Sequence, residues 1–218
     1  MVKFSFIIPI YGKQTDHNIM HCIDALLRQT DKNFEIIISG NKVLPSNPQI
    51  MNGINVYNTE VNTNRLGLLM NEGFKMCTGE YIHIWNPDLM IYPDYVEILN
   101  DYILKYGEDN LYAGHLIDMR GIQSKKEPNI GLYFKSFDLA EGFCCFHKKH
   151  LEQFREEFEG FATHWCQEFL YRMNKKIKFI CMRDSDIVHI PHIMRISYDD
   201  SVISSQKSSQ LYEAMKCE

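Results

Sequence analysis

The chain has 218 residues, 45% of them hydrophobic and 23% charged, as in ordinary globular domains. Its formal net charge of −5, without a clustered Lys/Arg stripe, excludes a typical nucleic-acid-binding surface. No segment approaches the roughly 18 apolar residues of a membrane span. Seven cysteines without a CxxC pair indicate reduced thiols and a cytoplasmic location.

The first half of the chain predicts strands that alternate with helices. An apolar run from Lys3 to Pro9 predicts a strand buried on both faces. Further strands are expected at 34–38, 54–57 and 81–85, and helices at 19–27, 66–77 (ended by Gly79) and 93–103. This alternation indicates a mostly parallel sheet with helices on both sides. Such sheets bind ligands beyond the carboxyl ends of their strands.

The second half is less regular and shows no linker that would divide the chain. We expect strands at 111–118, 131–137, 177–181 and 187–190, with another apolar segment at 141–146. Helices are expected near 151–158 and 163–173, followed by a polar, Ser-rich end with a final helix. The chain therefore predicts one domain.

One ordered set of motifs is informative beyond the fold class. Asn71-Glu72-Gly73 is followed by Thr78-Gly79-Glu80-Tyr81-Ile82, an apolar strand and Asn86-Pro87-Asp88. This order resembles the family 2 glycosyltransferases, whose pattern is N-x-G, A-x-G-E-Y-I, a strand and the D-x-D metal motif. The first strand running into Pro-x-Tyr, the segments 26–38 and 168–173, and the His189/His192 segment extend the resemblance from residue 2 to about 200.

The resemblance implies an α/β fold of the GT-A type in a single domain over residues 1–218. Its parts would be a Rossmann-like nucleotide-sugar-binding half (1–105), an acceptor and catalytic half (106–200) and a C-terminal tail or helix (201–218). It also implies a hexosyltransferase-class enzyme that moves a sugar from a nucleotide-diphosphate sugar to a glycan or other hydroxyl acceptor, with inversion. A bound Mn²⁺ or Mg²⁺ would stabilise the diphosphate leaving group, and a base would deprotonate the acceptor.

The metal residues implied by this resemblance are Asp88, in place of the D-x-D carboxylate, and a C-terminal histidine. Asn86 replaces the other carboxylate and can hydrogen-bond a ribose or a water. The same three residues, Asn86-Pro87-Asp88, also suit a simple turn after a strand. His189 is preferred to His192 because it lies nearest the strand end, and either is alternatively a hydrogen-bonded histidine.

The implied donor-binding residues lie after the first two strands and before the second long helix. Each has a structural alternative: Tyr11 fills the edge of the sheet, Ser39 and Asn41 form a strand-to-loop turn, and Arg65 is a solvated residue at a helix start. The set is Pro9, Tyr11, Ser39, Asn41, Arg65, Asn86 and Asp88.

The late helix carries the implied base and acceptor contacts. Glu168 is either a displaced catalytic base or a structural carboxylate paired with Arg172 four residues on. Cys166 lies near the family's acidic position and is best read as a buried thiol. Trp165 is either an acceptor-binding wall, on which a sugar face would stack, or a buried core residue.

Two functions follow, and the sequence favours the first. Asp88 and the nearly complete motif order predict an active transferase. The changes at Asn86, Gly40 and Cys166 instead favour a catalytically degenerate GT-A module that binds nucleotide or glycan or serves in a larger assembly.

Overall fold

The computed structural model describes residues 3–10, 16–40, 49–59, 61, 63, 65–118, 143–156 and 164–189. Strand β1 (Phe4–Ile10) is buried at every position, as its apolar run predicts. It pairs in parallel with β2 (Phe34–Gly40) and with β5 (Tyr81–Ile84), and β2 pairs in parallel with β4 (Ile54–Asn58). This parallel centre flanked by helices confirms the predicted α/β class.

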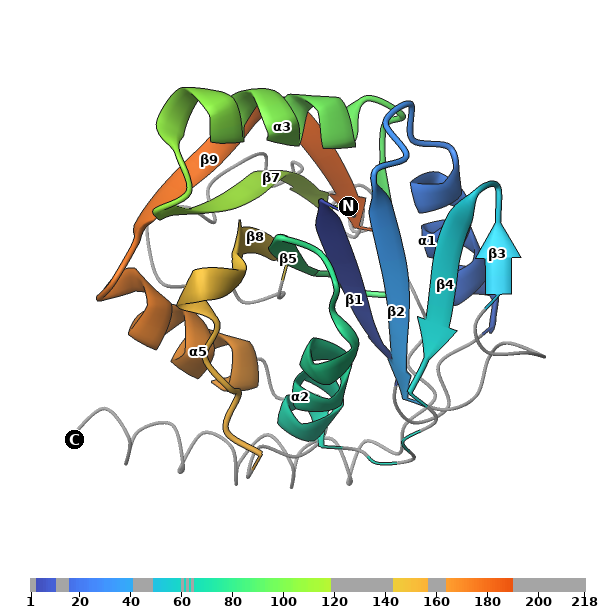
Figure 1. The fold of residues 1–218 in the computed structure, drawn as a ribbon, viewed down its shortest axis with the longest axis horizontal. Coiled ribbons are helices and arrows are strands. Elements are labelled where there is room, and N and C mark those ends of the chain that lie inside the picture. Colours follow the sequence, from blue (N-terminus) through green and yellow to red (C-terminus); the bar gives the residue numbers. More distant parts are fainter. Residues whose placement is uncertain are drawn as a thin grey trace, which may run out of the picture.

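Five further strands extend the sheet to the order β3-β4-β2-β1-β5-β8-β7-β9-β6 (Figure 1). The change from the first half of the chain to the second occurs at β8 (Cys144–His147), which runs antiparallel to both β5 and β7 (Asn110–Asp118). Strand β9 (Lys178–His189) lies parallel to β7 and antiparallel to β6 (Leu89–Ile91), and β3 (Gln49–Met51) forms the other edge.

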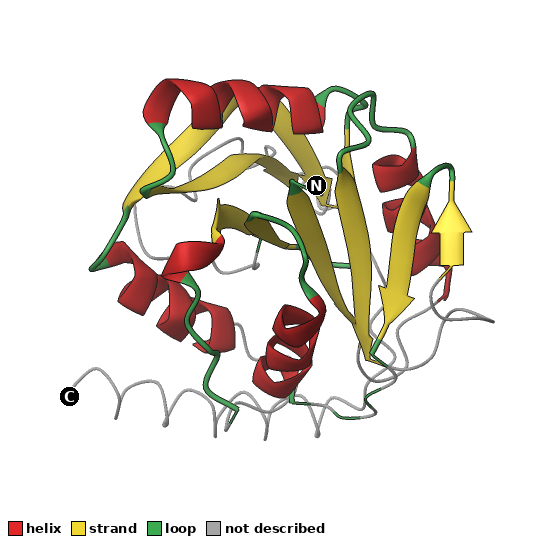
Figure 2. Cartoon of the chain, viewed as in Figure 1, coloured by secondary structure: helices red, strands yellow, loops and turns green. Residues whose placement is uncertain are grey.

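The helices cover both faces of the sheet, with α1 and α3 on one side and α2 and α5 on the other (Figure 2). Their apolar stripes explain these positions, because each stripe is buried against the strands. The bounds are Asp16–Leu27 for α1, Leu66–Met76 for α2, Tyr95–Tyr106 for α3 and His164–Asn174 for α5, and residues Lys148–His150 form a 3₁₀ turn. Among the described residues, no helix has the length and apolarity needed to cross a membrane.

Gly79 does not end α2, contrary to the prediction. The helix ends at Met76, and the capping residue Cys77 has extended backbone angles. Gly79 instead follows the helix where the chain passes very close to β1, since a Cβ on it would lie 2.7 Å from Ser5 Oγ and 2.8 Å from the carbonyl carbon of Phe4. The glycine is therefore needed for close packing of two segments.

Two predictions for the second half were also wrong. Residues 151–156, the described part of the predicted helix at 151–158, form no helix, and they run along α2. The two short strands at 177–181 and 187–190 are one strand, β9, through residue 189. A register shift explains the apparent break, because Gly114 pairs with Met182 whereas His115 pairs with Asp186. The predicted elements at 131–137 and 201–218 lie outside the described residues.

Candidate functional site

The ends of β1 and β2 lie side by side where ligands of such sheets bind. Pro9 pairs with Ser39, and Ile10 pairs with Gly40, so two of the predicted donor residues are direct neighbours. We call the ends of β1, β2 and β5, together with the residues directly after each, the carboxyl edge.

The Ser39 side chain is fully buried and already bonded within the fold. Its hydroxyl donates to the carbonyl oxygen of Leu69 in α2 and lies 3.2 Å from the Thr59 hydroxyl. These contacts tie β2 to α2, which supports the structural alternative for this residue.

Gly40 explains why the usual family aspartate is missing from the end of β2. Its φ is +142°, and a Cβ placed there would lie 1.9 Å from the carbonyl oxygen of Ile10. No side chain fits at that distance, so an aspartate at this register would require β1 and β2 to separate.

The segment after β5 forms a turn. Trp85 donates its backbone N–H to the carbonyl of Ile7 at 2.9 Å, and the N–H of Leu89 bonds the carbonyl of Asn86 at 3.4 Å. The Cys22 thiol, whose pKa burial raises, lies 3.6 Å from the same carbonyl. Asn86 and Asp88 are half-buried on this fixed turn, which gives their side chains a defined position.

The backbone brings the two predicted metal ligands to one place. Leu89, directly after Asp88, pairs with His189 at the end of β9. Paired residues in neighbouring strands lie about 5 Å apart. Asp88 and His189 therefore come from distant parts of the sequence to the same point beside the carboxyl edge; the side chain of His189 is outside the described residues.

Glu168 is buried on α5 and held by two arginines. Its two carboxylate oxygens accept hydrogen bonds from Arg172, at 2.6 Å from Nε and 3.0 Å from Nη2, and Arg155 Nε lies 3.4 Å away. Only 4% of the residue is exposed. The predicted i,i+4 pair with Arg172 is thus present, and the neighbouring Cys166 is the buried thiol that the sequence indicates.

Of the other predicted site residues, the structure describes the position of Arg65 and only the backbone of Trp165. Arg65 occupies the N-cap position of α2 without a side-chain capping bond and is exposed, and its backbone N–H lies 3.2 Å from the Thr63 hydroxyl. Trp165 lies in the first turn of α5, and nothing is described of its side chain. Tyr11 and Asn41 lie outside the described residues.

Asn71 has a positioning role that the motif alone did not reveal. Its buried amide accepts from the N–H of Phe154 at 2.8 Å, donates to the carbonyl of Phe154 at 3.0 Å and donates to Glu156 at 2.9 Å. This clamp holds the segment that carries Arg155 beside Glu168. The signal in the sequence was the N-x-G spacing, which places Asn71 and Gly73 on α2.

The comparison with protein-family models decides the family. The model for glycosyl transferase family 2 matches residues 5–143, which is more than half of the chain. The chain belongs to glycosyl transferase family 2. The match runs from β1 to the segment before β8 and so includes the whole carboxyl edge.

Relatives agree with this assignment. The chain is 25% identical over 150 residues to glycosyltransferase GlyA of Streptococcus pneumoniae, a match covering 66% of this chain and 18% of that protein. The chain thus spans less than a fifth of the length of that curated relative.

Solved structures show the same fold. S. aureus TarS 1–349 matches with a TM-score of 0.66 at 18% identity, over 86% of this chain and 60% of that one. Its complex with UDP gives 0.66 at 17% identity, over 93% and 63%. Its complex with UDP-GlcNAc gives 0.63 at 16% identity, over 96% and 65%.

A second group of possible metal ligands lies away from the family 2 carboxyl edge. Ligand atoms of Glu80, Glu108 and His147 all lie within 4.8 Å of one another. Glu80 precedes β5 whereas Asp88 follows it, so this cluster is at the opposite end of that strand. His147 Nδ1 accepts the Lys149 N–H at 3.1 Å, and its Nε2 lies 3.6 Å from Glu80 Oε1 and 3.5 Å from Glu108 Oε2.

Proposed function

We propose that this family 2 domain transfers a sugar from a nucleotide-diphosphate sugar, bound at the carboxyl edge, to a glycan or other hydroxyl acceptor with inversion. The pairing of Leu89 with His189, which brings Asp88 and the end of β9 together, is the observation that carries the proposal. The TarS structures with UDP and UDP-GlcNAc support a uridine nucleotide as the first donor to test.

The residues near Asp88 and the end of β9 have side chains of the types that bind divalent cations. Asp88 offers a carboxylate, Asn86 an amide oxygen and His189 an imidazole, a set that Mn²⁺ accepts and Mg²⁺ accepts in part. Because Asn86 replaces one carboxylate of the D-x-D motif, we expect this site to bind the cation more weakly. When bound, the cation would neutralise charge on the departing diphosphate.

The chain's own residues would then position the donor and acceptor. Pro9 and Tyr11 would line the nucleotide, Asn86 and Asn41 would hydrogen-bond it, and Trp165 would stack on an acceptor sugar.

Two further assignments complete the proposal. Glu168 stands either as the base that deprotonates the acceptor or as an anchor of α5, and its two arginine partners support the anchor. The division into a donor half (1–105) and an acceptor half (106–200), with a tail at 201–218, belongs to the same proposal. A cytoplasmic location is supported by the free thiols of the six described cysteines.

The second candidate is a GT-A module that binds a nucleotide or glycan without turnover. It is favoured by the pairing of the Glu168 carboxylate with Arg172 and by the amide, in place of a carboxylate, at Asn86. This module could also serve in a larger assembly. Turnover separates it from the transferase where it binds a nucleotide, and the absence of nucleotide binding would leave the module as the remaining candidate.

Thermal unfolding with UDP, GDP, dTDP and CMP, each with and without Mn²⁺, tests nucleotide binding. A ligand that binds only the folded state raises the melting temperature. At a ligand concentration of 100 times its Kd, the free energy of unfolding increases by about 2.7 kcal/mol. We expect a Mn²⁺-dependent shift with UDP. No shift with any nucleotide, in protein shown to be folded, would overturn the transferase proposal.

Two matched variants locate the metal. Asp88→Asn removes the carboxylate at the carboxyl edge and should abolish the Mn²⁺-dependent part of the shift. Glu80→Gln removes one from the cluster at the other end of β5 and should leave the shift unchanged. The reverse pattern would move the metal to Glu80, Glu108 and His147. Release of sugar from the donor by the wild-type protein then distinguishes the transferase from the binding module.

A further inference from the structure

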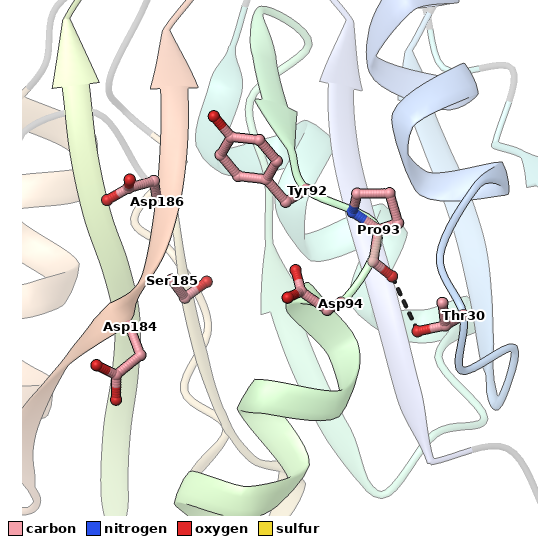
Figure 3. A pocket seen from close by; sticks show the side chains of 7 residues that line it. All are labelled: Thr30, Tyr92, Pro93, Asp94, Asp184, Ser185 and Asp186. Carbon is pink, nitrogen blue, oxygen red and sulfur yellow. Dashed lines mark hydrogen bonds between the residues drawn. The ribbon is translucent and has the colours of Figure 1, made fainter.

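Helix α1 and the residues that follow it contact both ends of the segment between β5 and α3. At the end next to α3, the Nε2 of the buried Gln29 donates to the Tyr92 carbonyl at 2.8 Å. The Oε1 of Gln29 accepts a backbone N–H from the first turn of α3 at 3.1 Å and so caps that helix. The Thr30 hydroxyl donates to the Pro93 carbonyl at 3.0 Å (Figure 3). This end of the segment is therefore fixed from α1.

Cys22 makes the corresponding contact at the other end of the segment, beside the predicted metal residue. It belongs to the apolar stripe of α1 and is fully buried. Its thiol donates to the carbonyl oxygen of Asn86 over 3.6 Å, and the same oxygen accepts the Leu89 N–H at 3.4 Å. A carbonyl oxygen has two lone pairs, so it can accept from both donors together. The thiol thus connects α1 to the turn that carries Asp88.

The surroundings of Cys22 keep it in the protonated form, which can donate. Burial raises the pKa of its thiol well above the usual range, the Trp85 indole N–H lowers it, and the negative charge of Asp88 raises it. The Trp85 Nε1 is itself buried without an oxygen or nitrogen acceptor in the described part of the chain. Sulfur is a weak acceptor, so the thiol partly compensates this N–H. Cys22 therefore interacts with the residues on both sides of the end of β5 and with Asp88.

The turn depends on such a contact because its own hydrogen bonding is weak. Pro87 has no N–H to donate. The bond from the Leu89 N–H to the Asn86 carbonyl, at 3.4 Å, is longer than the usual range of about 2.7–3.2 Å. Removal of the Cys22 sulfur would leave a space into which the turn can relax, because a core closes only partly around a deleted group.

We propose that Cys22 positions the Asn86-Pro87-Asp88 turn, and with it the Asp88 carboxylate, for the cation and the nucleotide-diphosphate sugar. This inference rests on the proposed function, in which Asn86 and Asp88 bind the donor and its cation. Because the Cys22 side chain is fully buried, it acts through the turn and not on the ligands. Loss of a residue that orients a metal ligand ordinarily weakens metal binding by roughly 10–100-fold.

Two alanine variants separate positioning from simple packing. Cys22→Ala removes the thiol at the turn. Cys77→Ala is the matched control, because Cys77 is also buried and its thiol also donates to a backbone carbonyl, that of Gly73 at 3.4 Å. Cys77 precedes β5, whereas Asn86 follows it, so the control lies at the other end of that strand. Cys22→Ser keeps a donor for the Asn86 carbonyl and tests rescue.

Amide hydrogen exchange in the ligand-free protein tests the hold on the turn. We expect the Leu89 amide to exchange about tenfold faster in Cys22→Ala than in the wild-type protein, because local opening of the turn becomes easier. Cys77→Ala should leave the exchange of Leu89 within about twofold of the wild-type rate. Unchanged exchange of Leu89 in folded Cys22→Ala would overturn the proposal.

Calorimetric titration with UDP in the presence and absence of Mn²⁺ tests the consequence for ligands. We expect the Mn²⁺-dependent affinity to fall about tenfold in Cys22→Ala, and less than about threefold in Cys22→Ser and Cys77→Ala. Unchanged affinity in folded Cys22→Ala, or an equal loss in Cys77→Ala, would overturn the proposal. Wild-type protein that binds no UDP would refute the proposed function instead, and the exchange of Leu89 would still decide whether Cys22 holds the turn.

Discussion

At the scale of one residue, the carboxylate of Glu168, which the family resemblance offers as a catalytic base, is paired with two arginines of the fold. Both of its oxygens are bonded to Arg172, and Arg155 lies 3.4 Å from one of them. A base must contact the acceptor hydroxyl whose proton it takes, and both oxygens of this carboxylate already accept hydrogen bonds from Arg172. The contacts therefore favour anchoring of α5.

Glu168→Gln tests this assignment. We expect the free energy of unfolding to fall by about 2 kcal/mol, because a buried ion pair loses one partner, and turnover to fall less than about tenfold. Denaturant unfolding measures the first and initial rates the second. A loss of about 10²–10⁴ in kcat at unchanged stability would instead establish Glu168 as the base.

Gly40 gives a second prediction at this scale. Gly40→Ala should cost about 3 kcal/mol or more, because the new Cβ would meet the carbonyl oxygen of Ile10 at 1.9 Å in a backbone conformation that alanine avoids. Gly53→Ala is the matched control, since its φ is also positive at +79° but nothing lies within 4 Å of the added Cβ. We expect about 1 kcal/mol there by denaturant unfolding. Equal losses would mean that strain, and not the contact, sets the cost.

At the scale of elements, α2 connects strands β1 and β2 to the 154–156 segment through Asn71. The helix packs on β1 and β2, while the Asn71 amide holds the 154–156 segment and the absence of a side chain at Gly67 lets Arg155 approach. A Cβ on Gly67 would lie 2.2 Å from the carbonyl oxygen of Arg155.

Asn71→Ala should release this segment. We expect a loss of about 2–4 kcal/mol, since the N–H of the buried Phe154 is left without its acceptor, and faster hydrogen exchange at Phe154. Glu72→Gln on the same helix loses only an exposed pair with Lys75 and should cost less than about 0.5 kcal/mol. Unchanged exchange at Phe154 in Asn71→Ala would contradict the clamp.

The sequence predicted elements best where local pattern and tertiary context agree. The apolar runs of β1 and β2 and the stripe of α3 are visible in the sequence because burial on one or both faces needs those residues. Strands β3 and β6 have three residues each, too few for any periodicity, and β9 looked like two strands because its register shifts near Gly114.

For the candidate site, the family resemblance implies that Asp88 and a C-terminal histidine hold the metal together. The ladder between β6 and β9 brings the backbone of residue 189 next to Leu89, directly after Asp88. The clamp of Asn71 and the cap that Gln29 gives α3 depend on residues 83 and 67 positions away, so no local pattern contains them.

At the scale of the whole molecule, the sheet contains a titratable group that limits its stability in acid. His83 is fully buried between Phe6, Trp85 and Tyr95, and its Nε2 lies 2.6 Å from the Tyr95 hydroxyl. Burial lowers the pKa of His83 from 6.5 to about 3. The folded protein therefore keeps this ring neutral while the unfolded chain takes up a proton below pH 6.5.

The sign of the resulting pH dependence follows from this difference. Because the unfolded state binds the extra proton, the free energy of unfolding falls as pH is lowered from about 6.5 toward 3, and the loss reaches a few kcal/mol. His83→Gln keeps a hydrogen-bonding group for Tyr95 but cannot titrate, so its stability should depend less on pH across this range. Urea unfolding at pH 7, 5.5 and 4.5 measures both proteins. Parallel pH profiles would show that His83 is not the group responsible for the slope.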